Sequence, residues 1–166
     1  MISHRSLLEN VKTVSRVTNM TDDPKKVPAD SVGVCWLPHP HDMGLLGSYL
    51  MTPFAGLHMV CFSPLDFITN RLLWQDTIVR YDACVTSGPN FAYGLVAKRA
   101  QQAGPSKQGL WSRMRYVCNA AEPVDPNVLE AMRSVLGVPD HAIGVGYAFS
   151  KGIDSRQQHI KYSIVT

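Results

Sequence analysis

Two patterns of apolar and polar positions alternate along the chain. Short, nearly continuous apolar runs bounded by proline or glycine predict strands that are buried on both faces. Longer segments with an apolar residue every three or four positions predict helices. The predicted strands are residues 32–37, 57–62, 83–86, 113–119 and 142–147. The predicted helices are residues 6–18, 45–54, 70–81, 91–102 and 126–136.

Local signals mark several ends of these elements. Ser6 and Glu9 have the spacing of a capping box at the start of the first helix. Pro24 and Pro28 fall in residues 19–30, which we expect to form a surface loop. Asp125 precedes a proline suited to the first helical position, and Gly137 follows the last apolar residue of that helix as a C-terminal stop.

Alternating strands and helices of this length predict an α/β fold, with a mostly parallel sheet and flanking helices. Ligands of such sheets bind at the carboxyl ends of the strands. We therefore expect chemistry in the loops after Leu37, Thr86, Cys118 and Gly146.

Composition narrows the function classes. Charged residues make up 17% of the chain, below the ~25% usual for soluble domains, so part of the surface is expected to be covered by a partner or by further chain. The net charge of +3 is scattered, which argues against a nucleic-acid role. Neither a run of ~18 apolar residues nor a signal-type N-terminus is present, so the prediction is a cytoplasmic protein without a transmembrane segment.

The four cysteines sit at wide, irregular spacing in apolar or strand-like segments, and none forms a C-x-x-C pair. This pattern predicts neither a zinc site nor a disulfide framework. We expect Cys35, Cys61, Cys84 and Cys118 to be buried free thiols.

Three strand ends carry candidate chemistry. Residues 36–44 place His39, His41 and Asp42 in one turn, which is compatible with a divalent metal but also with one histidine that orients the turn and one that is exposed. Residues 86–93 combine a glycine and a proline with a capping asparagine and two aromatic residues. Residues 118–123 include small side chains that would let a flat ring approach the backbone, although an ordinary β-turn would account for the same residue types.

The common phosphate loop, dinucleotide turn and hydrolase elbow are absent, because the sequence contains no G-x-x-x-x-G-K-[ST], G-x-G-x-x-G or G-x-S-x-G. Five segments taken in order nevertheless resemble the fatty acyl-AMP ligases of the adenylate-forming superfamily. The family patterns are W-L-P-x-x-H-D-M-G-L, S-P-x-x-F, G-P-N-F-A-Y and N-G-A-E-P, preceded by the helix that begins here at residue 2. The matching segments are residues 2–10, 36–45, 63–67, 89–93 and 119–123.

The resemblance spans about residues 2–147 and implies part of the large N-terminal domain of an adenylate-forming enzyme. It also implies a reaction in which ATP and a fatty acid give acyl-AMP and pyrophosphate with Mg²⁺. The acyl group then passes to the thiol of an acyl carrier protein or a polyketide synthase.

The same resemblance implies two sets of site residues. The acyl-adenylate pocket is expected at His41, Asp42, Met43, Gly44, Pro89, Asn90 and Phe91. The adenine-binding turn is expected at Asn119, Ala120, Ala121, Glu122 and Pro123, with Tyr147 stacking on the base.

Departures from the family pattern lower the expected activity of this chain. The phosphate loop of the family lies before residue 2, and Lys151 stands where a magnesium-binding glutamate is expected. Ala120 replaces a glycine, and the C-terminal domain with its catalytic lysine is not matched. We therefore expect residues 1–149 to be a partial AMP-binding domain and residues 150–166 a divergent polar tail.

As a truncated piece, this chain is predicted to be inactive alone, poorly soluble, and without catalytic residues or metal ligands of its own. ATP, AMP and Mg²⁺ are expected to bind it weakly or not at all. A first alternative is a non-catalytic nucleotide- or acyl-binding scaffold module. A second is a metal hydrolase of the barrel amidohydrolase type that uses His39 and His41.

Overall fold

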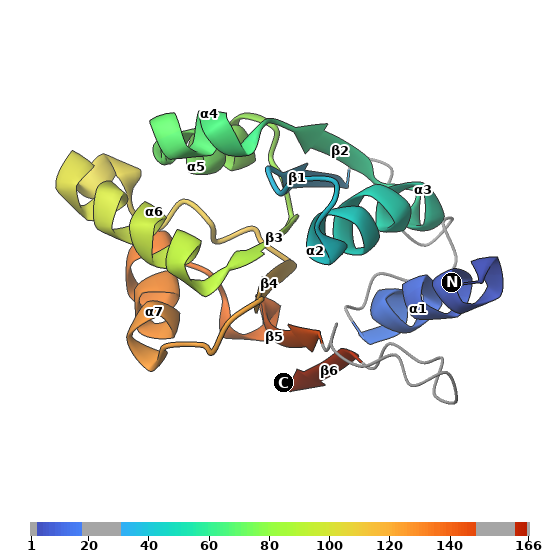
Figure 1. Cartoon of the computed structure of the whole chain (residues 1–166). Helices are drawn as coiled ribbons and strands as arrows, with labels where there is room; N and C mark the ends of the chain where they lie inside the picture. Colours follow the sequence, from blue (N-terminus) through green and yellow to red (C-terminus); the bar gives the residue numbers. More distant parts are fainter. Residues whose placement is uncertain (1–2, 18–30, 149–161, 166) are drawn as a thin grey trace.

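The computed structural model describes residues 3–17, 31–148 and 162–165 of the 166-residue chain. Their centre is one six-stranded sheet with the order β2-β1-β3-β4-β5-β6 (Figure 1). The first five strands are mutually parallel, whereas β6 runs antiparallel to β5. The strands are β1 (Val32–Cys35), β2 (His58–Cys61), β3 (Val85–Pro89), β4 (Tyr116–Ala120), β5 (Ile143–Ala148) and β6 (Tyr162–Val165).

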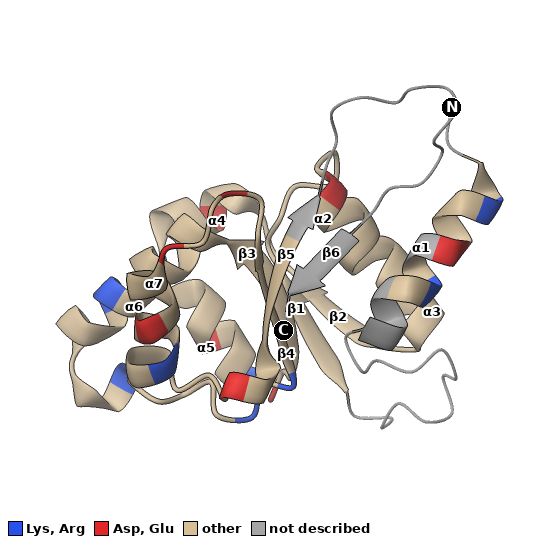
Figure 2. Cartoon of the chain, turned by 90° about the horizontal axis from the view of Figure 1, so that it is seen from below, with Lys and Arg blue, Asp and Glu red and all other residues tan. Residues whose placement is uncertain are grey.

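Helices cover both faces of this sheet. One layer holds α1 (His4–Val17), α2 (Asp42–Gly44), the π-helical segment η2 (Leu45–Leu50) and α3 (Met51–Ala55). The other layer holds α4 (Pro64–Thr69), α5 (Leu72–Arg80), α6 (Asn90–Ala103), α7 (Pro126–Ala131) and the π-helical segment η4 (Met132–Leu136). Short 3-10 turns lie at η3 (Pro105–Lys107) and η5 (Asp140–Ala142). Figure 2 shows the two layers on opposite sides of the strands, with charged residues of both signs interspersed over helices and loops.

The predicted α/β fold with a mostly parallel sheet is confirmed. Two strands are shifted from their predicted ranges, because β3 continues through Gly88 to pair with β4, and residues 111–114 form a turn before β4 begins. The first helix begins at His4, and Ser3 Oγ accepts the backbone N–H of Ser6 at 3.1 Å, so the predicted N-cap at Ser6 was wrong. The loop predicted at residues 19–30 lies outside the described residues.

Besides the short 3-10 turns, helix α4 and strand β6 were not predicted. Helix α4 is short, but Ser63 and Asp66 form a capping box before it and Pro64 occupies its first position. Strand β6 lies in the segment that we expected to be a polar tail. No helix in the described ranges is long and apolar enough to span a membrane.

The main core lies between the sheet and the layer of α4 to α7, and aromatic rings fill it. Trp36 stacks on Phe67 with ring centroids 4.1 Å apart, and Trp74 meets Trp36, Phe67 and Trp111 edge-on at 5.2–5.8 Å. The Trp74 Nε1–H donates to Thr86 Oγ1 at 2.9 Å, and this hydroxyl donates to the Val34 carbonyl at 2.8 Å. This chain of bonds satisfies the buried indole N–H of Trp74 and hydroxyl of Thr86, and it links α5, β3 and β1 inside an apolar core.

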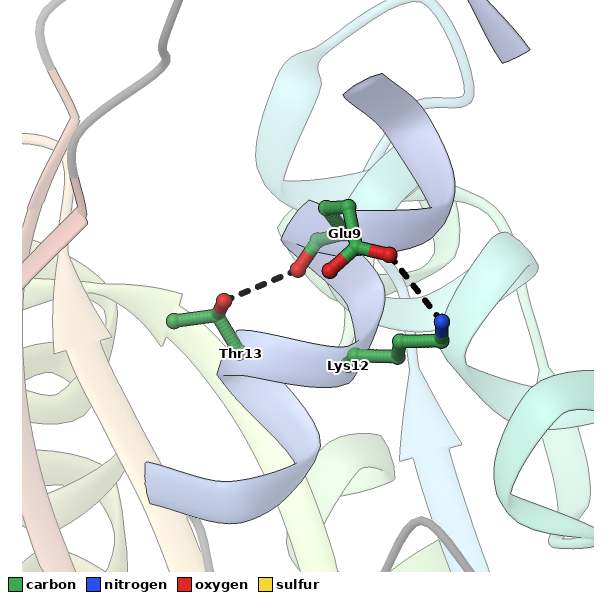
Figure 3. Close-up of polar contacts among 3 residues, drawn as sticks. All are labelled: Glu9, Lys12 and Thr13. Atoms are coloured by element: carbon green, nitrogen blue, oxygen red, sulfur yellow. Dashed lines mark hydrogen bonds and ion pairs between the residues drawn. The ribbon is translucent and has the colours of Figure 1, made fainter. Parts of the chain in front are cut away.

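Helix α1 carries local polar contacts on its surface. Lys12 Nζ lies 3.0 Å from Glu9 Oε1, and Thr13 Oγ1 donates to the Glu9 carbonyl at 2.8 Å (Figure 3). On another side of this helix Val11 is buried, and α1 packs against η2 and α3. Helix α1 therefore belongs to the smaller layer.

The cysteines differ from the sequence-based prediction at one position. Cys35 and Cys84 are buried and Cys118 is half-buried, but Cys61 is exposed. The reason is that β2 is the edge strand of the sheet, which a pattern of apolar residues cannot reveal.

Candidate functional site

The carboxyl ends of β3 and β4 lie side by side and bring two predicted segments together. Gly88 pairs with Asn119 and Pro89 with Ala120 in the parallel register. Helix α6 begins immediately after β3, and the turn 121–125 leaves β4 beside it. A Cβ atom at Gly88 would lie 2.6 Å from the Trp74 ring, so only glycine lets β3 approach the aromatic core here.

Two buried amide side chains join these strand ends. Asn119 Nδ2 donates to Asn90 Oδ1 at 3.0 Å, and the same oxygen accepts the Asp125 backbone N–H at 3.4 Å. Asn119 is fully buried, and its Oδ1 has no hydrogen-bond partner among the described residues. The pair thus fixes the start of α6 against the turn after β4.

A carboxylate makes the second bridge between the two turns. Glu122 Oε1 accepts the backbone N–H of Phe91 at 2.6 Å. Phe91 is the second residue of α6, whose first turn contains no acidic residue of its own. Glu122 therefore acts as a cap from a distant segment and places negative charge at the positive end of the helix dipole.

The turn after β4 requires an unusual backbone. Ala121 has a φ of 75°, which places a non-glycine residue in the left-handed region. Ala120, the residue before it, is buried. A Cβ atom built at Gly146 of β5 would contact Ala120 and Cys118 at 3.3 Å, so small residues on β4 and β5 allow the two strands to pack closely.

The segment after β1 forms a compact turn of its own. The backbone N–H of His41 donates to the Pro38 carbonyl at 3.1 Å, and His41 Nδ1 accepts the Met43 N–H at 3.2 Å. A Cβ atom at Gly44 would lie 2.4 Å from the Pro38 carbonyl oxygen, which explains the glycine. Because Nδ1 of His41 accepts a hydrogen bond, the neutral ring carries its proton on the exposed Nε2.

Buried groups on β4 and α6 serve structure. Tyr93 donates its hydroxyl to the Cys118 carbonyl at 2.7 Å. Burial raises the pKa of the Tyr93 hydroxyl and of the Cys118 thiol, and it also raises the pKa of the Tyr116 hydroxyl. These groups are therefore protonated at neutral pH, when they are neither bases nor nucleophiles.

The structure also bears on the metal and hydrolase alternatives. His39 bonds the Tyr49 hydroxyl, and no three His, Cys, Asp or Glu side chains gather within residues 3–17, 31–148 and 162–165. The open sheet contradicts the barrel that the hydrolase alternative needs.

The predicted residues thus fall into two groups. Asn90, Phe91, Asn119 and Glu122 are joined by direct bonds, while His41 to Gly44 form a separate turn at the end of β1. The Tyr147 backbone lies in β5, but its side chain and Lys151 lie outside the described residues. Sequence analysis did not identify the contact of Asp125 with Asn90, which joins residues 35 positions apart.

The amino-acid sequence is similar to a known enzyme family and to several of its members. The profile of AMP-binding enzymes matches residues 1–150. A protein named as a ligase from Mycobacterium tuberculosis is 38% identical over 130 residues, covering 78% of this chain and 23% of that protein. The medium-chain-fatty-acid–acyl-carrier-protein ligase JamA of Moorena producens is 30% identical over 132 residues, covering 78% of this chain and 21% of that protein.

Solved structures similar to this chain are also adenylate-forming ligases and adenylation domains. A fatty acyl-adenylate ligase from Legionella pneumophila, in complex with acyl adenylate and pyrophosphate, has a TM-score of 0.75 at 32% identity and is matched over 89% of this chain. An adenylation domain of a keto acid-selecting module, bound to keto acyl adenylate, has a TM-score of 0.74 at 26% identity. The chain covers 25% and 26% of these two structures, so it spans about a quarter of the length of its relatives.

Proposed function

The chain belongs to the AMP-binding enzymes and within them resembles the fatty acyl-AMP ligases, and on this premise we propose that it forms the adenylate-binding edge of a fatty acid adenylating ligase. The proposed reaction of the complete domain joins a fatty acid carboxylate to the α-phosphate of ATP and releases pyrophosphate. The acyl group is then passed to a carrier thiol, on an acyl carrier protein or a polyketide synthase.

One observation carries this proposal. The two motifs that the family resemblance assigns to the acyl-adenylate, residues 89–93 and 119–123, are bonded to each other at adjacent strand ends through Asn90–Asn119 and Glu122–Phe91. Strand ends of a parallel sheet are where nucleotides bind in this class of fold.

The proposed roles follow from the local geometry. The backbone of Ala120, Ala121 and Pro123 is proposed to contact adenine, because small side chains leave it approachable. Asn119 and Glu122 hold that turn in place through their hydrogen bonds to Asn90 and Phe91 at the start of α6. Tyr147 is proposed to stack on the base.

The turn after β1 is proposed to face the acyl-phosphate end of the ligand. With Nδ1 engaged by Met43, the Nε2–H of His41 can donate to a carboxylate or phosphate oxygen. Asp42, Met43 and Gly44 shape this turn, and Pro89 and Phe91 supply apolar surface for the chain of the fatty acid. Phe91 is an exposed large apolar residue, which fits that role.

The described residues fit a magnesium ion less well than they fit the adenylate. Mg²⁺ is usually held by one or two carboxylates together with phosphate oxygens. Both carboxylates of the turn after β4 already accept backbone hydrogen bonds: Glu122 Oε1 from the Phe91 N–H, and Asp125 Oδ1 from the Asn127 N–H. The described residues therefore do not provide a Mg²⁺ site of this kind.

We further propose that residues 1–149 act as a partial AMP-binding domain and that the chain is inactive alone. Adenylation needs groups that position and neutralise the phosphates, and the family places these in segments that this chain does not match. The alternative is a binding module that holds a nucleotide or acyl group without chemistry. The adenine turn and the His41 turn would support binding in both cases.

The test is calorimetric titration of the chain with a non-hydrolysable acyl-adenylate analogue, with and without Mg²⁺. Micromolar binding that His41→Ala weakens about tenfold, while the matched exposed control His141→Ala does not, would support the proposed site. Binding of equal strength in both variants, or none by folded protein, would contradict it. Radiolabelled pyrophosphate exchange then tests the proposed inactivity of the chain alone, because only a catalytic chain incorporates label into ATP.

A further inference from the structure

Two cysteines that lie 26 positions apart in sequence become direct neighbours in the sheet. Cys35 ends β1 and Cys61 ends β2, and the parallel register pairs them with each other. From this pairing we infer a sulfur site for a soft, low-coordinate cation of the Cu(I) type, formed by Cys35 and Cys61 with the thioether of Met59 on the same face of the sheet.

The spacing of the two thiols fits a bridging cation better than a disulfide. Paired residues on neighbouring strands lie about 4.8 Å apart and point to the same face. A disulfide needs Cβ atoms about 3.5–4.5 Å apart, so the strands would have to move together. A zinc–thiolate bond is about 2.3 Å long, and a cation held between two sulfurs by bonds of about this length spans roughly 4.6 Å. This span is close to the strand spacing, so no such movement is needed.

Met59 adds a third sulfur on this face. It lies two residues before Cys61 on β2, so its side chain projects to the same side of the sheet. Its Sδ lies 2.9 Å from the position that a Cβ atom would take at Gly33, the β1 residue two positions before Cys35. The thioether thus leans over β1, along the same face as the two thiols. Thiolate and thioether ligands suit soft ions such as Cu(I), Zn²⁺ and iron–sulfur clusters. Structural zinc sites and iron–sulfur clusters usually take four ligands, so two thiols and one thioether favour Cu(I) among these.

A cation can reach the two thiols from the side of Cys61. Cys61 is exposed, whereas Cys35 is 1% exposed. Burial raises the pKa of the Cys35 thiol, while hydrogen bonds with Ser48 of η2 and the Leu37 backbone lower it; burial also raises the pKa of Cys61. Both thiols are therefore protonated in the free protein, and a cation has to displace their protons.

The binding step balances simply. Two thiols and one Cu⁺ give a bis-thiolate complex with a net charge of −1 and release two protons, with no change of oxidation state. Harder cations find no comparable set here, because no three His, Cys, Asp or Glu side chains gather in the part of the chain that the structure describes. A soft two- or three-coordinate cation is thus the chemistry that these residues fit.

The test is an anaerobic titration of the reduced chain with Cu(I) supplied by a coloured Cu(I) chelator, whose bleaching reports transfer to the protein. We expect the chain to withdraw one equivalent. Cys61→Ser should lower the apparent affinity at least tenfold, and Met59→Leu should lower it by a smaller factor. The matched controls Cys84→Ser and Cys118→Ser should retain it.

Cys61 is the decisive position, because an exposed edge residue can be replaced without loss of the fold, which circular dichroism verifies. Cys35→Ala is the second variant and should match Cys61→Ser if it folds. The inference is overturned if Cys61→Ser binds copper as strongly as the unmodified chain, or if all four cysteine variants lose binding equally. The readout is copper transfer alone, so it stands or falls separately from nucleotide binding.

Discussion

Replacing Glu122 tests whether a carboxylate from the turn after β4 caps helix α6. In Glu122→Ala the Phe91 N–H loses its acceptor at 2.6 Å and the helix loses a negative charge near its amino end. A hydrogen bond to a charged group contributes about 1.5–3 kcal/mol, and the helix dipole adds about 0.3–1 kcal/mol. Glu122 is half-buried, and solvent screening reduces both contributions. We expect a net loss of about 1.5 kcal/mol in the free energy of unfolding.

The graded variant separates the two contributions. Glu122→Gln keeps an oxygen acceptor but removes the charge, so it should lose only about 0.5 kcal/mol. For a chain of this size 1 kcal/mol shifts the melting temperature by about 2–4 °C. We therefore expect decreases of about 3–6 °C for Glu122→Ala and about 1–2 °C for Glu122→Gln.

Thermal unfolding followed by circular dichroism measures these shifts. Glu130→Ala is the control, because it removes the same charge from an exposed position on α7. The reasoning is refuted if Glu122→Ala melts within 1 °C of the control, or if the alanine and glutamine variants melt together. Raising the salt concentration should narrow the gap between wild type and Glu122→Gln, since screening weakens the charge contribution.

Three further predictions concern stability. Asn119→Ala should lower the free energy of unfolding in urea by about 2–3 kcal/mol, because Asn90 loses its buried donor; a loss below 1 kcal/mol would contradict this. Ala121→Gly should raise the free energy of unfolding by about 0.5 kcal/mol, because relief of a left-handed alanine exceeds the entropy cost of glycine. A free energy of unfolding below that of the unmodified chain would argue against the positive φ of Ala121. Stability should fall as pH rises above about 9, because the unfolded chain releases protons there that the folded chain still holds; a urea series from pH 8 to 10 that stays flat would refute it. The groups concerned are Cys35, Cys61, Tyr93, Tyr116 and Cys118.

Sequence reasoning predicted the elements that depend on local pattern. The apolar run before Pro38 and the Asp125–Pro126 start with its Gly137 stop became a strand and a helical segment because burial and capping act within a few residues. Helix α4 was missed although its capping box, Ser63 to Asp66, is readable in the sequence.

Contacts between distant segments were beyond such reasoning. The bond from Glu122 to Phe91 spans 31 positions, and the pairing of Cys35 with Cys61 depends on which strand lies at the edge. Family resemblance indicated that residues 89–93 and 119–123 belong to one site. Only strand order and register specify that Asn90 and Asn119 are the residues that join them.

The aromatic core has a consequence for spectroscopy. All three tryptophans of the chain are buried in the core between the sheet and the layer of α4 to α7, and the ring centroid of Trp74 lies 5.4 Å from that of Trp36 and 5.2 Å from that of Trp111. At such distances the indoles exchange excitation energy and report as one chromophore. Intrinsic fluorescence will therefore follow the melting of that layer, whereas detachment of α1 and α3 from the other face will leave the emission spectrum unchanged.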